Sequence, residues 1–276
     1  MARWLPLAFC ACALSALGFA AVSCGGSSGA KTISGTPGTT ATASGSGTAA
    51  NTTPDDPKAA PILKAPASLY SINLDDLGTA FFTDISQTYV LTLDSYAAAQ
   101  GAFSSATEGK KDLTDWGYLG GYETAYIPEG RETAVLQGQY YITIESHLFK
   151  SEAGAKQAYD YFNAKLKSSV STLVSGPQVG NESAVWKLVS GTIPTSTTPA
   201  AYHRLIFRRG NLVSIVLTFG ADPFMTTQPV HDLAVIVDQK ALGKKAVVEP
   251  TPTSNFTPNP ADAPTPAGTS ATGAGH

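Results

Sequence analysis

AYHRLIFRRGNLVSIVLTFG, residues 201–220, contains two apolar segments on either side of Gly210 and Asn211. Each segment is rich in β-branched and aromatic residues, which are typical of strands. A Gly-Asn pair suits the positive φ angles of a tight hairpin turn, and so short a connection permits only antiparallel pairing. We therefore expect an antiparallel hairpin here, and this hairpin sets the class of the sheet.

A strand followed by a helix is predicted upstream of this hairpin. Residues 140–149, YYITIESHLF, alternate with period two, which indicates a strand with one buried face. Residues 150–170 follow at helical spacing, with Ser151 placed to cap the start. The helix should pack on the sheet through one apolar stripe, made of Ala155, Ala158, Tyr159, Phe162 and Leu166.

Further elements complete an α+β domain over residues 67–248. The pattern predicts strands at 79–84, 122–127 and 182–191, and helices at 95–107 and 230–242, the last ending near Gly243. Runs of hairpin strands exclude a doubly wound parallel sheet. We expect an antiparallel β-sheet packed by about three α-helices, with disordered arms at both ends of the chain.

The first 23 residues have the pattern of a signal peptide. Arg3 supplies a positive start, Leu5 to Val22 is an apolar run without charge, and small residues stand before Cys24. An uncleaved membrane span is the alternative, since this run could just cross a bilayer. We expect cleavage and export.

Cys24 is the predicted attachment point to a membrane. Ala21-Val22-Ser23-Cys24 resembles a bacterial lipobox, and the resemblance implies a diacylglycerol on the Cys24 sulphur. Cys10 and Cys12 lie in the leader, so the mature chain keeps one cysteine and cannot form an internal disulfide. The expected location is extracytoplasmic, held to membrane lipid through Cys24. The alternative is an ordinary signal peptidase cut and a soluble secreted protein.

Low-complexity segments flank the expected domain. Residues 24–66 begin with Cys24, the expected site of lipidation, and continue mainly with Gly, Ser, Thr, Ala and Pro. Residues 249–276 are rich in Pro, Thr and Ala. Neither segment holds enough large apolar side chains to offset the entropy of ordering. We expect a disordered tether before the domain and a disordered tail after it.

Composition and motifs argue against several functional classes. The net charge of −3, with 14% charged residues, leaves no basic excess for a nucleic acid partner. The glycines of GYLGGY, residues 117–122, lack GxGxxG spacing and predict a loop, so we expect no nucleotide cofactor. The sequence contains no HExxH or CxxC motif. Glu145, His147 and His203 are weak metal candidates on neighbouring strands, with ordinary side-chain roles favoured; we expect neither metal nor catalytic residues.

Aromatic and basic side chains are the remaining candidates for ligand binding. Trp116, Tyr118 and Tyr122 cluster before and within one strand. Exposed aromatic patches are common where ligands bind, although core packing is the favoured explanation for such residues. The possible ligand-binding residues are Trp116, Tyr118, Tyr122, Trp186, Arg204 and Arg208. The arginines could clamp an anion or merely charge an edge strand.

The whole plan is similar to a group of exported modules. The lipobox-like border, the tether, and the segments at 115–126, 147–162, 179–187 and 207–220 resemble uncharacterised bacterial lipoproteins and, more distantly, PsbP-like and kinase-ectodomain-like modules. The resemblance implies an exported binding or sensory domain without catalysis, whose partner is a small ligand or a protein. An envelope enzyme, hydrolytic or metal-assisted, and a structural surface lipoprotein are the alternatives. The sequence does not identify the ligand or the oligomeric state.

Overall fold

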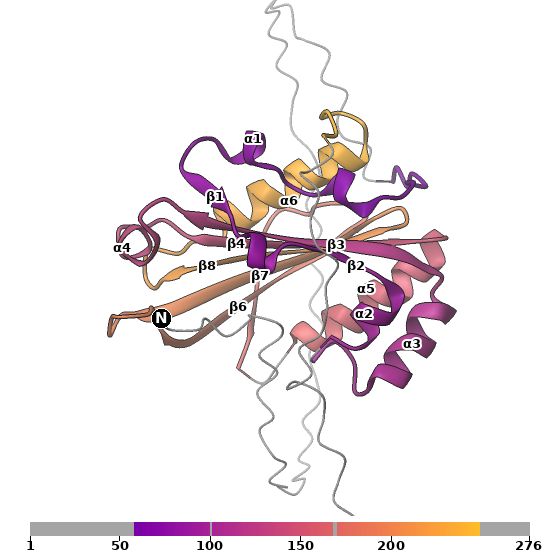
Figure 1. The fold of residues 1–276 in the computed structure, drawn as a ribbon, viewed down its shortest axis with the longest axis horizontal. Helices are drawn as coiled ribbons and strands as arrows, with labels where there is room; N and C mark the ends of the chain where they lie inside the picture. Colours follow the sequence, from indigo (N-terminus) through magenta and orange to yellow (C-terminus); the bar gives the residue numbers. More distant parts are fainter. Residues whose placement is uncertain (1–57, 100, 168–169, 249–276) are drawn as a thin grey trace, which may run out of the picture. The chain divides into compact units, whose positions relative to one another are not determined.

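An antiparallel sheet with helices on both faces forms the folded part of the chain (Figure 1). The computed structural model describes residues 58–99, 101–167 and 170–248. The predicted α+β class with an antiparallel sheet is confirmed within these ranges. The leader, Cys24, most of the expected tether and the C-terminal tail lie outside the described residues.

The sheet has eight strands in the order β1-β3-β4-β8-β7-β6-β5, with β2 also paired to β3. All pairings are antiparallel. The strands are β1 Phe81–Thr83, β2 Tyr89–Leu91, β3 Tyr118–Pro128, β4 Tyr141–Phe149, β5 Thr172–Val174, β6 Glu182–Thr192, β7 Pro199–Arg209 and β8 Leu212–Ala221. The segment GYLGGY, expected to form a loop, lies mostly in β3, where a bulge between Tyr118 and Gly120 accommodates its glycines.

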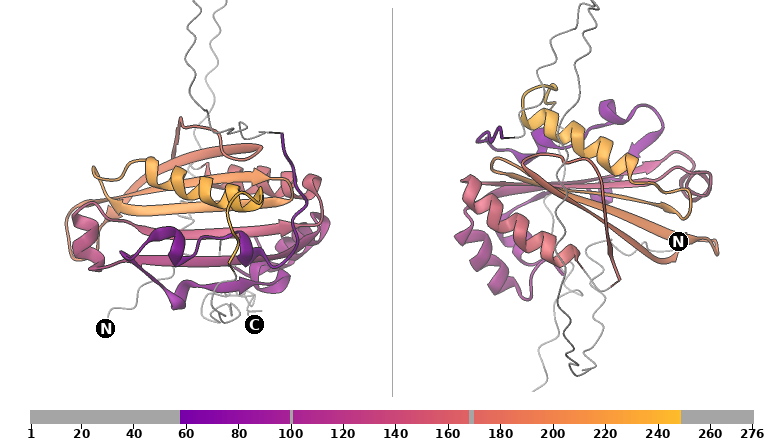
Figure 2. Two further views of the ribbon diagram at one scale, coloured as in Figure 1. Left: turned by 90° about the horizontal axis from the view of Figure 1, so that it is seen from above. Right: turned by 180° about the vertical axis from the view of Figure 1, so that it is seen from behind.

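Three of the six α-helices within the described ranges are long, and they lie on opposite faces of the sheet. The helix α6 covers one face, while α2, α3 and α5 lie against the other (Figure 2). The helices are α1 Leu74–Leu77, α2 Leu93–Ala97, α3 Ala106–Asp115, α4 Arg131–Leu136, α5 Glu152–Leu166 and α6 Gln228–Ala241, with 3₁₀ turns η1 Ala67–Tyr70 and η2 Ile85–Gln87. Among the residues described, no helix is both long and apolar enough to span a bilayer.

Local signals account for the helix ends that the sequence predicted. The Ser151 hydroxyl accepts a hydrogen bond from the Gly154 amide and caps α5 as expected. The helix expected over residues 95–107 is instead split between α2 and α3. Ala98 ends α2, and Ser105 begins α3 by accepting a hydrogen bond from the Glu108 amide. Two capped starts therefore replace one continuous helix.

The hairpin between β7 and β8 holds the segment that precedes the domain. Gly210 has a φ of +55°, whereas Asn211 does not have the positive φ expected of the turn pair. The Asn211 side chain instead accepts from the Leu63 amide at 2.7 Å and donates to the carbonyls of Leu63 and Phe149 at 3.0 and 2.6 Å. The Asn211 side chain thus pairs with both backbone groups of Leu63, as a neighbouring strand would.

We call residues 59–63 the N-terminal strap. Arg209 and Asn181 both donate to the Ala59 carbonyl, at 2.9 and 3.0 Å. The strap belongs to the stretch expected to be tether, but it is hydrogen-bonded to the domain before the expected boundary at Ala67. Buried Arg209 is fixed in turn by Asp238 of α6 through hydrogen bonds of 2.6 and 2.8 Å.

Candidate functional site

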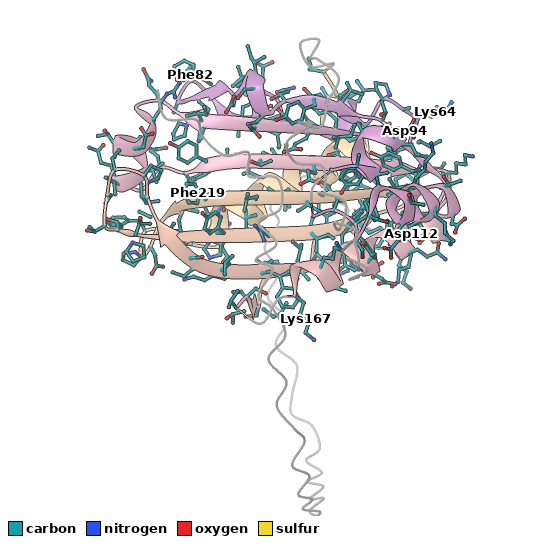
Figure 3. All side chains as sticks on the ribbon, turned by 60° about the horizontal axis from the view of Figure 1, so that its bottom comes forward. Lys64, Phe82, Asp94, Asp112, Lys167 and Phe219 are labelled. Atoms are coloured by element: carbon teal, nitrogen blue, oxygen red, sulfur yellow. The ribbon has the colours of Figure 1, made fainter. Side chains whose placement is uncertain are left out.

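A groove lies on the part of the sheet that α2, α3 and α5 leave bare. In Figure 3 these helices gather at the end marked by Asp94 and Asp112, while Phe219 lies on the strands towards the other end. The groove has a volume of about 280 Å³. This is close to the lower end of the range for small-molecule sites. Its floor combines apolar and polar side chains of the central strands: Glu123, Ala125, Ile127, Tyr141, Thr143 and Phe219.

The groove is bounded on one side by the loop between β1 and β2 and at one end by the start of α4. Asp84, Ser86 and Gln87 line it from the loop, and the Asp84 carboxylate caps the η2 turn by accepting from the Ser86 amide at 3.0 Å. Arg131 is the first residue of α4, and it lines the end of the groove that α4 bounds. Arg131 has a φ of +49°, a conformation that is uncommon for a non-glycine residue.

Two carboxyl groups face each other at the end of the groove nearest α2, away from Arg131. Glu123 on β3 is directly opposite Glu145 on β4, so their side chains leave the same face of the sheet. Burial, together with the nearby Glu145 charge, raises the pKa of the Glu123 carboxyl well above its ordinary value. No hydrogen bond to the Glu123 carboxyl is made within the described ranges. This carboxyl is therefore available to a ligand.

An aromatic network beneath α2 supports Glu145. His147 Nε2 lies 3.3 Å from Glu145 Oε2, and the Tyr96 hydroxyl donates to the same oxygen at 3.5 Å. The other imidazole nitrogen lies 3.3 Å from the Tyr118 hydroxyl, and the Tyr96 ring stacks on the imidazole at 4.4 Å. A Cβ at Gly121, the residue opposite His147, would lie 2.7 Å from that ring. His147 is wholly buried, so both of its nitrogens serve this network.

The opposite end of the groove carries positive charge. Burial and the Glu132 charge raise the pKa of Tyr141 to about 12, while the Arg131 charge lowers it. This effect of Arg131 indicates that its guanidinium lies near the Tyr141 phenol. Arg131 is exposed and makes no ion pair in the part of the chain that the structure describes. The groove thus runs from a carboxyl pair to an accessible guanidinium.

Three of the aromatic residues predicted for ligand binding are buried, and Trp116 is half-buried. Trp116 packs against Phe103, and Tyr118 belongs to the network beneath α2. Tyr122 is buried in the core under α6, and the Trp186 indole donates to Asn163 at 2.8 Å. None of these four lines the groove. A role for them in ligand binding stays a prediction.

The predicted arginines also lie outside the groove. Arg208 is largely buried and donates to Glu182 at 2.6 Å, Glu152 at 3.0 Å and the Gly210 carbonyl at 3.1 Å. Arg204 is directly opposite Trp186 and Leu217 in the sheet. The charge of Arg208 is therefore matched inside the domain, and anion binding by either arginine stays a prediction.

The three weak metal candidates do not converge. Glu145 and His147 share the groove face, but His203 is paired through Thr218 with Ile142, which is an odd number of residues from Glu145 on β4. His203 therefore points to the α6 face, and the sheet separates it from the other two. The residues described contain no group of three His, Cys, Asp or Glu side chains placed to hold a metal ion.

Sequence reasoning singled out neither Arg131 nor Glu123. Facing carboxylates could be found only from the register of β3 with β4. That register depends on α4 and on the loops around it, whose lengths do not match a standard hairpin. A weak signal is present, because Glu123 and Glu145 each fall within an apolar strand pattern.

Comparisons with known proteins reveal a distant structural likeness. No family model and no curated protein match the chain. Among solved structures, the extracellular domain of PknH from Mycobacterium tuberculosis is similar, with 13% identity and a TM-score of 0.38. The match covers 66% of this chain and 100% of that one. At that level of similarity no function is transferred.

Proposed function

We propose that this chain is an extracytoplasmic, lipid-anchored domain that binds a small ligand in the groove on its sheet and performs no chemistry itself. The groove carries the proposal, because it combines an apolar floor with polar groups at both ends that the domain does not use internally. Buried polar groups usually find partners within a fold. Glu123 has no such partner among the described residues, and the exposed Arg131 makes no ion pair there, so both are well placed to contact a ligand.

An enzymatic role has one observation in its favour, the Glu145–His147 contact at 3.3 Å. General acid-base chemistry requires a group within hydrogen-bond reach of the substrate. Because the His147 side chain is wholly buried and held by Tyr118 and Glu145, it supports the carboxyl pair rather than facing the groove. Binding is therefore the function that we propose.

A nitrogen-labelled sample of the whole mature chain tests the ligand site. Amide spectra are recorded with a library of small polar and aromatic compounds, and we expect the shifts to gather on groove residues of β3 and β4. Thr143→Trp should block these shifts by filling the groove, whereas Thr114→Trp on the exposed face of α3 should not. If no compound shifts groove amides, or if Thr143→Trp leaves the shifts unchanged, the proposal is wrong.

Membrane attachment is tested separately. The intact mass of the native mature protein distinguishes a diacylglyceryl group on Cys24 from a free thiol and from an uncut leader. A free thiol at Cys24, with the protein in the aqueous phase after detergent extraction, would remove the anchor while leaving the groove untouched.

A further inference from the structure

The two ends of the groove carry complementary chemistry. Glu123 lines one end, where Glu145 lies directly opposite it on β4, and Arg131 lines the other end with its guanidinium. Within the residues described, neither Glu123 nor Arg131 forms an ion pair. A molecule with one cationic and one anionic group could satisfy both ends at once.

The span between the ends limits the length of that molecule. Glu145 and Tyr141 are four residues apart on β4, which corresponds to about 13 Å along an extended strand. Tyr141 marks the Arg131 end, because the Arg131 charge is close enough to affect the pKa of the Tyr141 phenol. An extended tripeptide is about 10 Å long. Charge-assisted hydrogen bonds of about 2.8 Å at its two termini extend this reach to about 16 Å, which covers the span.

We propose that the groove takes a short zwitterionic chain, such as a peptide of about three residues, with its ammonium group at Glu123 and Glu145 and its carboxylate at Arg131. This inference rests on the proposed function, since it names the ligand class for the same groove. The floor residues Ala125, Ile127 and Phe219 would contact the apolar parts of the chain. Thr143 is a polar group on the same floor that could reach its amides.

An ammonium group fits the carboxyl pair better than a metal ion does. Protein metal sites usually supply three or more ligands, and the described residues hold no such group. An ammonium has three donors and can be shared by the oxygens of two carboxylates. Asp84 in the neighbouring wall adds further negative charge at this side of the groove.

Binding should be coupled to a proton. The groups that face Glu123 are Glu145 and, behind it, His147 on β4, Tyr118 on β3, Tyr89 on β2, Tyr96 on α2 and Asp84 in the loop. None of these side chains supplies a permanent positive charge. A bound ammonium would supply it and would favour the ionised form of the Glu123 carboxyl, whose pKa burial and Glu145 raise. We therefore expect the affinity for the ammonium end to rise with pH.

Calorimetric titration of the whole mature chain with tri-alanine tests the inference. N-acetyl-tri-alanine removes the ammonium, and tri-alanine amide removes the carboxylate. We expect each change to weaken binding at least about tenfold, in line with loss of a charge-assisted hydrogen bond. Glu123→Gln should reduce the effect of acetylation and leave that of amidation unchanged, because Glu145 still carries a carboxyl group at that end, and Arg131→Gln should abolish the effect of amidation alone. Glu129→Gln, in the exposed loop after β3, is the matched control and should behave as the native chain.

Two outcomes would overturn the inference. One is equal affinity of the native chain for all three peptides, or no binding of tri-alanine. The other is unchanged tri-alanine binding by Thr143→Trp, because the peptide would then bind outside the groove. In either case, the amide spectra recorded with the compound library test the proposed function independently. Groove shifts with other compounds would leave that function standing with a different ligand class, whereas their absence would remove both.

Discussion

Replacing Glu123 by glutamine is expected to stabilise the folded chain near neutral pH. The substitution keeps the size of the side chain but removes one of two carboxyl groups that face each other across β3 and β4. The Glu145 side chain is only 15% exposed, so water screens the pair weakly. The native chain must either hold two like charges together or hold a proton on the pair, and both cost stability.

The magnitude follows from the cross-strand geometry. Side chains directly opposite each other in an antiparallel pair begin about 5 Å apart. At that separation two like charges repel by about 3 kcal/mol for an effective dielectric constant of about 20. Protonation and partial exposure relieve part of this repulsion. We therefore expect the variant to gain about 1 to 3 kcal/mol in the free energy of unfolding near pH 7.5.

The pH dependence has a defined sign. The folded-state pKa of Glu123 lies above its ordinary value of 4.5. This group therefore costs the native chain nothing below pH 4.5, and it lowers the free energy of unfolding as the pH rises through the folded-state pKa. Glutamine does not titrate, so the advantage of the variant should grow over the same range.

Urea unfolding of both chains, near pH 4 and near pH 7.5, measures this difference. Glu129→Gln is the control for removing an exposed carboxylate. An advantage of equal size at both pH values, or a variant less stable than the native chain at the higher pH, would refute the assignment of a mutually repelling carboxyl pair.

Three further predictions concern the interior. Asp238→Asn leaves the buried Arg209 charge without its partner and should lower the free energy of unfolding in urea by about 3 to 5 kcal/mol. Gly154→Ala would drive a Cβ into the Trp116 carbonyl and should cost about 1 to 3 kcal/mol, measured as a lower melting temperature. Burial and Lys187 lower the pKa of His203 from 6.5, so native stability depending on this group is lost as the pH falls below 6.5. The melting temperature of His203→Gln should therefore fall less between pH 7 and about pH 5.

Matched variants separate these effects from general damage. Asp232→Asn removes an exposed carboxylate of the same helix as Asp238 and should change stability by less than about 0.5 kcal/mol. Gly176→Ala adds a Cβ that would meet Val185 at an ordinary 3.9 Å. Equal losses for a variant and its control, or parallel melting curves of native and His203→Gln against pH, would contradict the corresponding prediction.

The elements predicted correctly were those with strong local signals. The hairpin at Gly210, the alternation of β4 and the Ser151 cap of α5 are each encoded within a few neighbouring residues. The helix expected over residues 95–107 was wrong because the apolar residues there belong to one core but not to one helix. Tyr96 and Phe103 meet edge to face at 5.9 Å across a turn. Their spacing in the sequence therefore resembled helical periodicity without a helix between them.

The groove was harder to predict because long-range register creates it. Glu123 and Glu145 become neighbours only through the pairing of β3 with β4, and Arg131 reaches the groove only because α4 interrupts the connection between these strands. The aromatic residues that drew attention in the sequence instead fill the cores on both faces of the sheet. Large apolar area is the main source of folding free energy, so aromatic clusters more often report packing than recognition.

The N-terminal strap determines how the domain would respond to mechanical load. Residues 59–63 are fixed to the turn between β7 and β8, and both strands lie inside the sheet rather than at its edge. A pull on the chain ahead of the strap would first reach Asn181, Arg209 and Asn211, whose hydrogen bonds share the force. Tension applied from the N-terminal side, where we propose the anchor, would thus be transmitted to the middle of the sheet instead of peeling away an outer strand.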